Sequence, residues 1–430
     1  MKKLFLILFF SLFILNCSKD ILLNFEKHQR GENPFDPLYP PMPSDENSGK
    51  WVFMVYLDAA NNLEYAGVAD LQEMVEGSKY VNTNNIRIIV LMDRIDGYST
   101  ADGDWKTTKL FEIKNGTKFL INTTINGQNT DGSVDFNMGH PDNLKEFIKY
   151  CLTKYSNYDY FLLDLWNHGG GWKDSLNSLE NALPRKAICW DEDSGNDTLY
   201  MDEVQSALSS ALGSKKLNLI YMDACLMQMV EVGYELRNLT KYLVASEETV
   251  PGNGGDYVDI LKRMGNLFNE SKATPFMVAY EIVSSYRAQY YSTSDTTLSA
   301  LNLEKISTLK VAIDTFSQNL MKLSGSQIKN IRSSVKDFTY NDQADLYHFA
   351  KLCNEKISGG VPGAFSVMEA IDSMIVKEYH NSSTAGAYGL AIYFPRTPKE
   401  VKIEYTSNFY YIDFISDSKW NDFIKWYKNQ

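Results

Sequence analysis

Short apolar runs alternate with segments of helical periodicity over about the first 250 residues of the chain. Each run is bounded by polar residues or glycine, which is typical of a strand buried on both faces of a parallel sheet. Between the runs, apolar residues recur at the spacing of one helix face. The pattern predicts strands at 51–57, 86–93, 159–166, 217–224 and 242–246, and helices at 62–76, 141–154, 201–212 and 226–237.

This alternation predicts an α/β fold, with a mainly parallel sheet flanked by helices. A polar region with β character is expected at 105–125. After about residue 257 the pattern becomes helical, at 274–289, 304–323 and 363–378, with apolar runs at 297–303 and 388–395. We therefore expect a core over residues 50–270 and a smaller C-terminal lobe over residues 271–430 that continues the same domain.

The N-terminal segment, MKKLFLILFFSLFILNC, has two lysines followed by an apolar stretch over residues 4–15. This stretch is too short to span a bilayer and is typical of a signal peptide. The end of the run is similar to a bacterial lipoprotein cleavage box, although Asn16 is bulkier than the residue usually found there. We expect residues 1–17 to be a lipoprotein signal peptide and Cys17 to be lipidated. An ordinary secretory signal is the alternative.

Residues 18–49 are polar and hold five of the twelve prolines of the chain. Proline-rich polar sequence stays extended, so we expect a tether between Cys17 and the folded domain. The expected location is outside the cell, lipid-anchored to a bacterial membrane at the cell surface or the periplasmic face. No other apolar stretch reaches the length of a membrane span.

Composition limits the partners of the protein. Removal of the signal peptide leaves 40 basic and 54 acidic residues, a net charge near −14, which argues against nucleic acid and is compatible with basic substrates. After Cys17 four cysteines remain, at positions 151, 189, 225 and 353. They could form two disulfides in an exported protein, but a large core needs no covalent support and we expect mostly free thiols. A monomer is the default expectation.

Candidate chemistry begins at Cys225, which lies with Asp223 and Ala224 where the strand formed by the apolar run of residues 217–222 ends. In parallel sheets, ligands bind beyond the carboxyl ends of the strands, so Cys225 lies where an α/β enzyme would place a nucleophile. A helix starting at residue 226 would favour the thiolate. The alternative for Cys225 alone is a small buried hydrophobic residue.

A second strand end carries His168, followed by Gly169, Gly170 and Gly171. Consecutive glycines weaken any helix or strand, and they suit a backbone that approaches a ligand closely and offers N–H groups to an oxyanion. Histidine and cysteine together are the pair that thiolate catalysis requires, because the imidazole takes the thiol proton and later protonates the leaving amine.

The motifs NHGGGW, YMDACLMQMVEVGYEL and VASEETVPGNGGDY, in this order, resemble the clostripain family of cysteine peptidases, which is related to caspases, legumains and gingipains. Further similar segments start at Trp51, Ile86 and Thr384, so the resemblance covers about residues 50–395. It implies a caspase-like catalytic core that acts on proteins or peptides without a cofactor. It also implies His168 as the general base and Cys225 as the nucleophile.

The resemblance at Asp223-Ala224-Cys225 suggests cleavage after Arg or Lys, because a carboxylate can pair with the substrate cation. Asp256 is a second candidate for this pocket, and Asp223 could instead hold the strand end. The backbone N–H groups of Gly169 and Cys225 are the candidates for the oxyanion site. Asn167 is a candidate to orient the His168 ring.

The connection over residues 173–198 is rich in residues that favour an exposed loop and contains Arg185-Lys186. Relatives in the clostripain family are activated by a cut in this interval, so the resemblance suggests self-processing after Arg185 or Lys186. A solvated turn is the alternative. The acidic run 191–197, DEDSGND, lacks the pattern of a calcium loop and is expected to be a solvated turn.

No metal ligand is assigned from the sequence, although the use of calcium by some relatives leaves a weak calcium site open. The competing function is a catalytically idle surface binding protein that keeps the same fold. Labelling of Cys225 by a thiol-reactive peptide probe would discriminate between the two.

Overall fold

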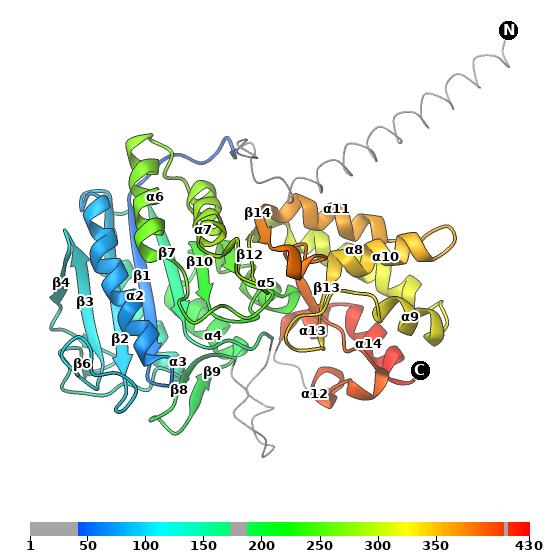
Figure 1. Cartoon of the computed structure of the whole chain (residues 1–430), viewed down its shortest axis with the longest axis horizontal. Coiled ribbons are helices and arrows are strands. Elements are labelled where there is room, and N and C mark those ends of the chain that lie inside the picture. Colours follow the sequence, from blue (N-terminus) through cyan, green and yellow to red (C-terminus); the bar gives the residue numbers. More distant parts are fainter. Residues whose placement is uncertain (1–41, 173–186, 408–411) are drawn as a thin grey trace, which may run out of the picture. The chain divides into compact units, whose positions relative to one another are not determined.

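The computed structural model describes residues 42–172, 187–407 and 412–430. One compact unit spans Pro43–Gln430 and contains a nine-stranded sheet with the order β14-β12-β11-β10-β7-β1-β2-β3-β4 (Figure 1). The five central strands are parallel, and two strands on each side are antiparallel. The predicted α/β fold with a mainly parallel sheet is thus confirmed. Cys17, Arg185 and Lys186 lie outside the described residues.

The parallel strands occupy the predicted apolar runs to within about two residues. They are β1 (Trp51–Ala59), β2 (Ile86–Arg94), β7 (Tyr160–Trp166), β10 (Leu217–Asp223) and β11 (Thr240–Ala245). All nine residues of β1 are buried. Alternate residues contribute to two separate hydrophobic clusters, Val52 and Met54 to one and Phe53 and Val55 to the other. Both faces of the sheet are therefore covered, which explains the continuous apolar runs.

Helices cover each face of this sheet. On one face, three helices contribute buried residues to the same hydrophobic cluster as Phe53: α2 (Glu64–Gly77), α6 (Tyr257–Asn269) and α7 (Pro275–Tyr290). Those that share the cluster of Val52 are α3 (Pro141–Lys154), α4 (Met201–Leu212) and α5 (Val230–Leu236). Figure 1 shows α2 in front of β1 and β2. The helices expected at 141–154 and 201–212 are found with these bounds.

The smaller strands either extend one end of the main sheet or form two-stranded sheets outside it. They are β3 (Lys109–Lys114), β4 (Thr117–Leu120), β5 (Thr124–Ile125), β6 (Gln128–Asn129), β8 (Ile188–Asp191), β9 (Asp197–Leu199), β13 (Gln343–Asp345) and β15 (Ala391–Tyr393). The 3-10 turns are η2 (Ser78–Tyr80), η4 (Leu303–Lys305), η5 (Ser382–Thr384) and η6 (Pro398–Glu400). Within the described part of the chain, no helix has both the length and the apolar character needed to cross a membrane.

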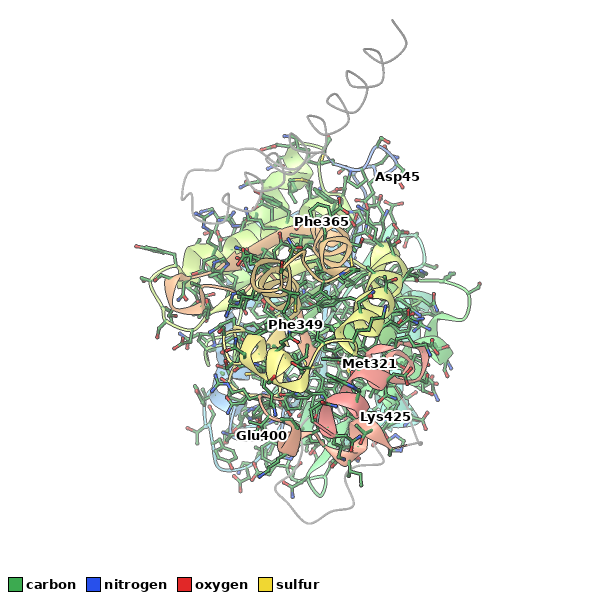
Figure 2. The ribbon with its side chains drawn as sticks, turned by 90° about the vertical axis from the view of Figure 1, so that its right-hand side faces the viewer. Asp45, Met321, Phe349, Phe365, Glu400 and Lys425 are labelled. Carbon is green, nitrogen blue, oxygen red and sulfur yellow. The ribbon has the colours of Figure 1, made fainter. Side chains whose placement is uncertain are left out.

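The C-terminal third adds two strands to the main sheet and a group of helices. The strands are β12 (Thr297–Asn302) and β14 (Ile375–His380). The helices are α8 (Ile306–Leu320), α9 (Gly325–Arg332), α10 (Leu346–Lys356), α11 (Ala364–Met374), α12 (Ile403–Thr406), α13 (Asp413–Asp417) and α14 (Trp420–Lys428). Figure 2 faces this group, which carries Phe349 and Lys425. Its buried side chains belong to the cluster of Val52, and a boundary at residue 270 stays a prediction.

The prediction of a helix over residues 363–378 is wrong for its last turn, which is a strand in the structure. Helix α11 ends at Met374, and β14 begins at Ile375 and pairs with β12. Ile375, Val376 and Tyr379 are β-branched or aromatic residues that pack well in a sheet. Pairing with β12, which is distant in the sequence, therefore favours a strand over a helix at these residues.

Candidate active site

The structure brings His168 and Cys225 to the same edge of the sheet. Strands β7 and β10 are parallel neighbours, and Trp166 pairs with Asp223 at the end of the ladder. His168 and Cys225 each follow two residues after this pair. The two candidate catalytic residues therefore lie at equivalent positions beyond adjacent strand ends, where parallel sheets bind ligands.

The glycine run is explained by close backbone contacts. A Cβ atom on Gly169 would lie 2.2 Å from the carbonyl oxygen and 3.0 Å from the nitrogen of Cys225. Gly171 has a φ of +83°, and a Cβ atom there would lie 2.6 Å from the sulfur of Met229. A side chain at either position would push the histidine segment away from the cysteine segment. Gly169 thus lies against the backbone of Cys225.

The thiol of Cys225 is half-buried and receives a backbone hydrogen bond from Val250, with 3.3 Å between nitrogen and sulfur. Burial raises the pKa of the thiol, and the charges of Asp223 and Glu248 add to this. The expectation of a helix N-terminus directly behind the thiol is wrong, because α5 begins only at Val230. The thiol therefore does not lie at a helix N-terminus, which would have favoured the thiolate.

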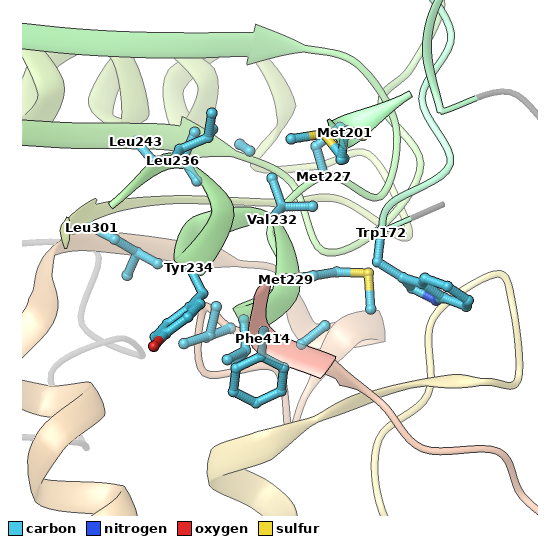
Figure 3. Packing of buried hydrophobic residues seen from close by; sticks show 14 of the residues in the cluster. Trp172, Met201, Met227, Met229, Val232, Tyr234, Leu236, Leu243, Leu301 and Phe414 are labelled. Atoms are coloured by element: carbon cyan, nitrogen blue, oxygen red, sulfur yellow. The ribbon is translucent and has the colours of Figure 1, made fainter. Parts of the chain in front are cut away.

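The segment between Cys225 and α5 is held in an unusual backbone conformation. Leu226 has a φ of +66°, which is uncommon for a residue other than glycine. Its N–H donates to the carbonyl of Glu248, and Met227 and Met229 are fully buried. Figure 3 shows Met229 extending toward Trp172, the residue that follows the glycine run. Core packing thus fixes the backbone immediately after the candidate nucleophile.

The His168 ring is positioned by Asn62, a residue that the sequence analysis did not identify. The Nε2 atom of His168 lies 2.8 Å from Oδ1 of Asn62. An amide oxygen only accepts hydrogen bonds, so Nε2 carries the proton in the neutral ring and Nδ1 is the basic nitrogen. The indole of Trp190 lies beside the ring, with 5.7 Å between centroids.

Asn167 contacts the backbone of His168 rather than the ring. Its Oδ1 accepts from the His168 N–H. Its Nδ2 donates to the Asp58 carboxylate at 2.6 Å and to the Trp190 carbonyl at 3.1 Å. All three partners are buried or half-buried. Asn167 therefore ties the histidine segment to the end of β1 and to β8.

We predict that Asn62→Ala lowers kcat by about tenfold, because the loss of one hydrogen bond of about 1.5 kcal/mol destabilises the imidazolium. The acid limb of the kcat/KM profile should move to lower pH, since the pKa of His168 falls and the ring must be neutral to take the thiol proton. Asn62→Asp should move the limb to higher pH. An Asn62→Ala enzyme with unchanged kcat and an unchanged limb would contradict this role.

Asp223 is buried at the end of β10 and is covered by the segment 250–256. Its Oδ2 accepts from the Gly255 N–H at 2.7 Å and from the Tyr257 hydroxyl group, whose oxygen is 3.0 Å away. The same hydroxyl oxygen lies 2.7 Å from the carboxylate of Asp164. Burial raises the pKa of Asp223 to about 6. Burial and the charge of Asp223 likewise raise the pKa of Asp164.

Asp70 of α2 completes a group that we call the strand-end cluster, formed by Asp70, Asp164 and Asp223. A Cβ atom on Gly254 would lie 2.6 Å from Oδ2 of Asp223 and 3.1 Å from Oδ2 of Asp70, so both carboxylates face this glycine. Asp70 accepts from the indole N–H of Trp166 at 2.6 Å. Burial and the charge of Asp223 raise the pKa of Asp70.

Asp256 has a different position from that of Asp223. It caps helix α6, with its Oδ1 accepting from the Asp259 N–H at 2.8 Å. Its charge contributes to the raised pKa of Glu73, after the larger effect of burial. Glu73 accepts from the Tyr257 N–H at 3.0 Å. Asp256 and Glu73 therefore add negative charge beside the strand-end cluster.

Fold and site together define a class of protein: an α/β protein with cysteine and histidine at adjacent ends of parallel strands, beside buried carboxylates. The model of the clostripain family matches residues 55–427. The chain belongs to the clostripain family, and it is a cysteine endopeptidase. This favours the enzyme over an idle binding protein.

Individual relatives agree with this assignment. Clostripain of Hathewaya histolytica is 29% identical, and the match covers 85% of this chain and 78% of clostripain. A secreted C11 cysteine protease from Bacteroides thetaiotaomicron, solved with an irreversible peptide inhibitor, has a similar fold, with a TM-score of 0.64 and 21% identity over 87% of this chain and all of that one. An inactive zymogen of a C11 protease from Parabacteroides distasonis gives a TM-score of 0.59 and 17% identity over 90% of this chain and 99% of that one.

Proposed function

We propose that this endopeptidase cleaves after Arg or Lys, with His168 and Cys225 as its catalytic dyad. The observation that carries the specificity is the strand-end cluster. Asp70, Asp164 and Asp223 are each less than 5% exposed, and among the described residues no Lys or Arg forms an ion pair with them. Burying a carboxylate without a cation is costly. A guanidinium or ammonium group from the substrate would supply the missing positive charge.

The proposed recognition places the substrate side chain against Asp223. Gly255 covers this carboxylate, so a side chain that reaches it displaces the hydrogen bond from segment 250–256. The new pair is charge-assisted and stronger than the bond that it replaces. Arg is favoured over Lys when two carboxylate oxygens can accept from one guanidinium group. Asp70 provides a second oxygen on the same side of Gly254.

The proposed reaction follows from the positions of the two strand ends. Nδ1 of His168 takes the thiol proton, and the thiolate of Cys225 attacks the peptide carbonyl carbon. The N–H groups of Gly169 and Cys225 hold the developing oxyanion. The imidazolium gives its proton to the leaving amine, and an acyl-enzyme remains on sulfur. Water, deprotonated by His168, then releases the carboxylic acid and restores the thiol.

The test of specificity compares matched peptides with Arg, Lys, citrulline, Ala or Asp before the scissile bond. We expect kcat/KM for Arg to exceed that for Ala by about 10⁴-fold, because a site built to pair with a charge rejects neutral analogues. The Arg-to-citrulline ratio should fall below pH 6, since Asp223 has a raised pKa of about 6 and is neutral below it. Effects of pH on the dyad cancel in this ratio.

Asp223→Asn is the matched variant for this experiment. It keeps the shape of the side chain and should lower kcat/KM for Arg by about 10²-fold while leaving citrulline nearly unaffected. The same substitution at Asp104, an exposed carboxylate in the loop after β2, is the control and should change neither rate. Equal rates for Arg and Ala in the native enzyme would refute the proposed specificity.

We also propose that the enzyme processes itself after Arg185 or Lys186. The described chain resumes at Ala187, which is buried and whose carbonyl accepts from the Gly170 N–H at 2.9 Å. Ile188 forms a bridge with Gly169. The proposed cut therefore falls one or two residues from a strand that contacts the glycine run. The inactive zymogen known for a C11 protease of P. distasonis supports regulation of this kind.

Export and membrane anchoring complete the proposal. The apolar N-terminus and Cys17 favour a lipoprotein, and the B. thetaiotaomicron relative is a secreted protease. We propose that the mature chain is held at a bacterial membrane by lipid on Cys17 and acts as a monomer on proteins or peptides. No cofactor is required for the dyad chemistry.

A further inference from the structure

Residues 333–342, which connect α9 to β13 and which we call the tyrosine loop, reach the candidate active site. Thr339 of this loop donates to the carboxylate of Glu248 through its backbone N–H, with 3.1 Å between nitrogen and Oε1, and through its hydroxyl group. The backbone carbonyl of Glu248 in turn accepts from the Leu226 N–H at 3.1 Å. Leu226 directly follows Cys225. Hydrogen bonds to a single residue therefore link the tip of the tyrosine loop to the candidate nucleophile.

The tip of the loop carries Tyr340, which directly follows Thr339. Its carbonyl accepts from the Gln343 N–H at 3.0 Å, which closes the turn. The side chain is 44% exposed. Partial burial raises the pKa of the phenol, and the charge of Cys225 adds to this. Charges act strongly on each other only over short distances, so the phenol and the thiol are neighbours.

The exposure of this ring is not the result of a loose loop. Phe338 is buried and packs in the hydrophobic core. Asp337 forms ion pairs with Arg332 and Arg396. The side chain of Arg332 is itself buried, and its Nε donates to the Phe394 carbonyl at 2.8 Å. A ring presented on a fixed backbone loses little conformational entropy when a ligand covers it, so it is well suited to bind one.

The strand order indicates which part of a substrate passes the tyrosine loop. Strands β7, β10 and β11 are neighbours in this order. His168 follows β7 and Glu248 follows β11, so they lie on opposite sides of Cys225. In the proposed reaction His168 protonates the leaving amine, which places the segment after the scissile bond on the histidine side. The acyl part of the substrate then lies on the side of Glu248 and the tyrosine loop.

The two faces of the sheet indicate which side chain of the acyl part meets the loop. Asp223 is covered by Tyr257, which belongs to the hydrophobic cluster of one face. The tyrosine loop packs through Phe338 into the cluster of the opposite face. Successive side chains of an extended peptide point in opposite directions. A side chain that points toward Asp223 is therefore preceded by one that points toward the tyrosine loop.

We propose that Tyr340 contacts the side chain of the residue that precedes the Arg or Lys at the cleavage site, and that it selects apolar side chains there. This specificity rests on the proposed function, in which the Arg or Lys itself pairs with Asp223. An apolar side chain that covers the aromatic ring leaves water together with part of the ring surface. A polar side chain loses hydrogen bonds to water in the same position. The substrate class is thus an apolar residue followed by a basic one.

The test compares two peptides that differ only in Leu or Asn directly before the Arg, because these side chains are similar in size and differ in polarity. We expect kcat/KM for Leu-Arg to exceed that for Asn-Arg about tenfold in the native enzyme, the size expected for an apolar contact that stays partly open to water. Tyr340→Ala should reduce this ratio to about one. Tyr340→Phe should keep the native ratio, since the ring provides the contact. Tyr340→Gln, which also removes the ring, serves if Tyr340→Ala is unstable.

Tyr80→Ala is the matched control. Tyr80 is 49% exposed in η2, before the amino end of β2, and its loss should leave the ratio unchanged. The proposal is overturned if the native enzyme cleaves both peptides equally, if Tyr340→Ala keeps the native ratio or lowers both rates equally, or if Tyr340→Phe loses the ratio. A failure of the proposed Arg or Lys specificity is distinguishable, because it appears as equal rates for Leu-Arg and Leu-Ala peptides.

Discussion

Cys225→Ala and His168→Ala are each expected to lower kcat/KM at least about 10²-fold, the usual size of a general-base contribution, with the larger loss for the nucleophile. The reason is that the pKa of the thiol is raised by burial, so little thiolate forms unless His168 takes the proton. Initial rates on an Arg-containing peptide measure both losses. Circular dichroism should show an intact fold, since neither residue is fully buried.

A thiol-reactive peptide probe separates the two roles. It should label Cys225 stoichiometrically in the native enzyme and fail to label it in His168→Ala. The other thiols of the folded domain, Cys151, Cys189 and Cys353, are free and buried, so they should stay unlabelled. His140→Ala, at the exposed start of α3, is the matched histidine control and should keep full activity. Near-normal turnover in either catalytic variant would show that the dyad is assigned incorrectly.

Wild-type protein is expected to split into two chains, with the new N-terminus at Ala187 or Lys186, whereas Cys225→Ala should remain whole. The reason is that an enzyme with the proposed specificity carries an Arg-Lys pair directly before β8. The two chains should stay together, because β7 and β10 pair within one sheet across the cut. Fragment masses under denaturing conditions and elution volume under native conditions measure both outcomes.

Arg185→Ala/Lys186→Ala is the variant that tests the position of the cut. It should stay whole while Cys225 remains reactive toward a small thiol reagent, which would show that the site itself is intact. Addition of active wild-type enzyme to Cys225→Ala then tells whether the cut occurs within one molecule or between two. Full activity in an uncut wild-type chain would exclude processing as a requirement.

The sequence was sufficient to predict the strands and to place His168 and Cys225 beyond adjacent strand ends, because each strand end is a local pattern and parallel topology brings the ends to one edge of the sheet. The predicted start of α5 was wrong by four residues, since the buried Leu226, Met229 and Val230 have the i, i+3, i+4 spacing of a helix face although residues 226–229 are not helical. Packing against residues distant in sequence decides the backbone there, as it does at β14.

The grouping of carboxylates in the strand-end cluster was the part that the sequence could not supply. The sequence pattern could have identified Asp70 as a buried carboxylate, because it lies four residues from Ala66 and from Met74 on the buried face of α2. A charged residue on the buried face of a helix calls for a structural or functional explanation. Tyr340 carried no comparable signal, since its proximity to Cys225 exists only in the folded chain. Asn62 could not be identified from the sequence either, because it is one of several polar residues that follow β1.

The pairing of β7 with β10 also determines when the candidate active site forms during folding. His168 and Cys225 come to the same edge of the sheet only when two strands far apart in the chain lie side by side, and parallel pairing of this kind forms slowly. Residues near the C-terminus take part as well, because Tyr393 and Tyr405 both donate to Glu231 of α5, behind the nucleophile segment. A chain that has not yet been made beyond α5 therefore lacks two hydrogen bonds that hold this helix, so the last part of the chain contributes to the structure behind the candidate site.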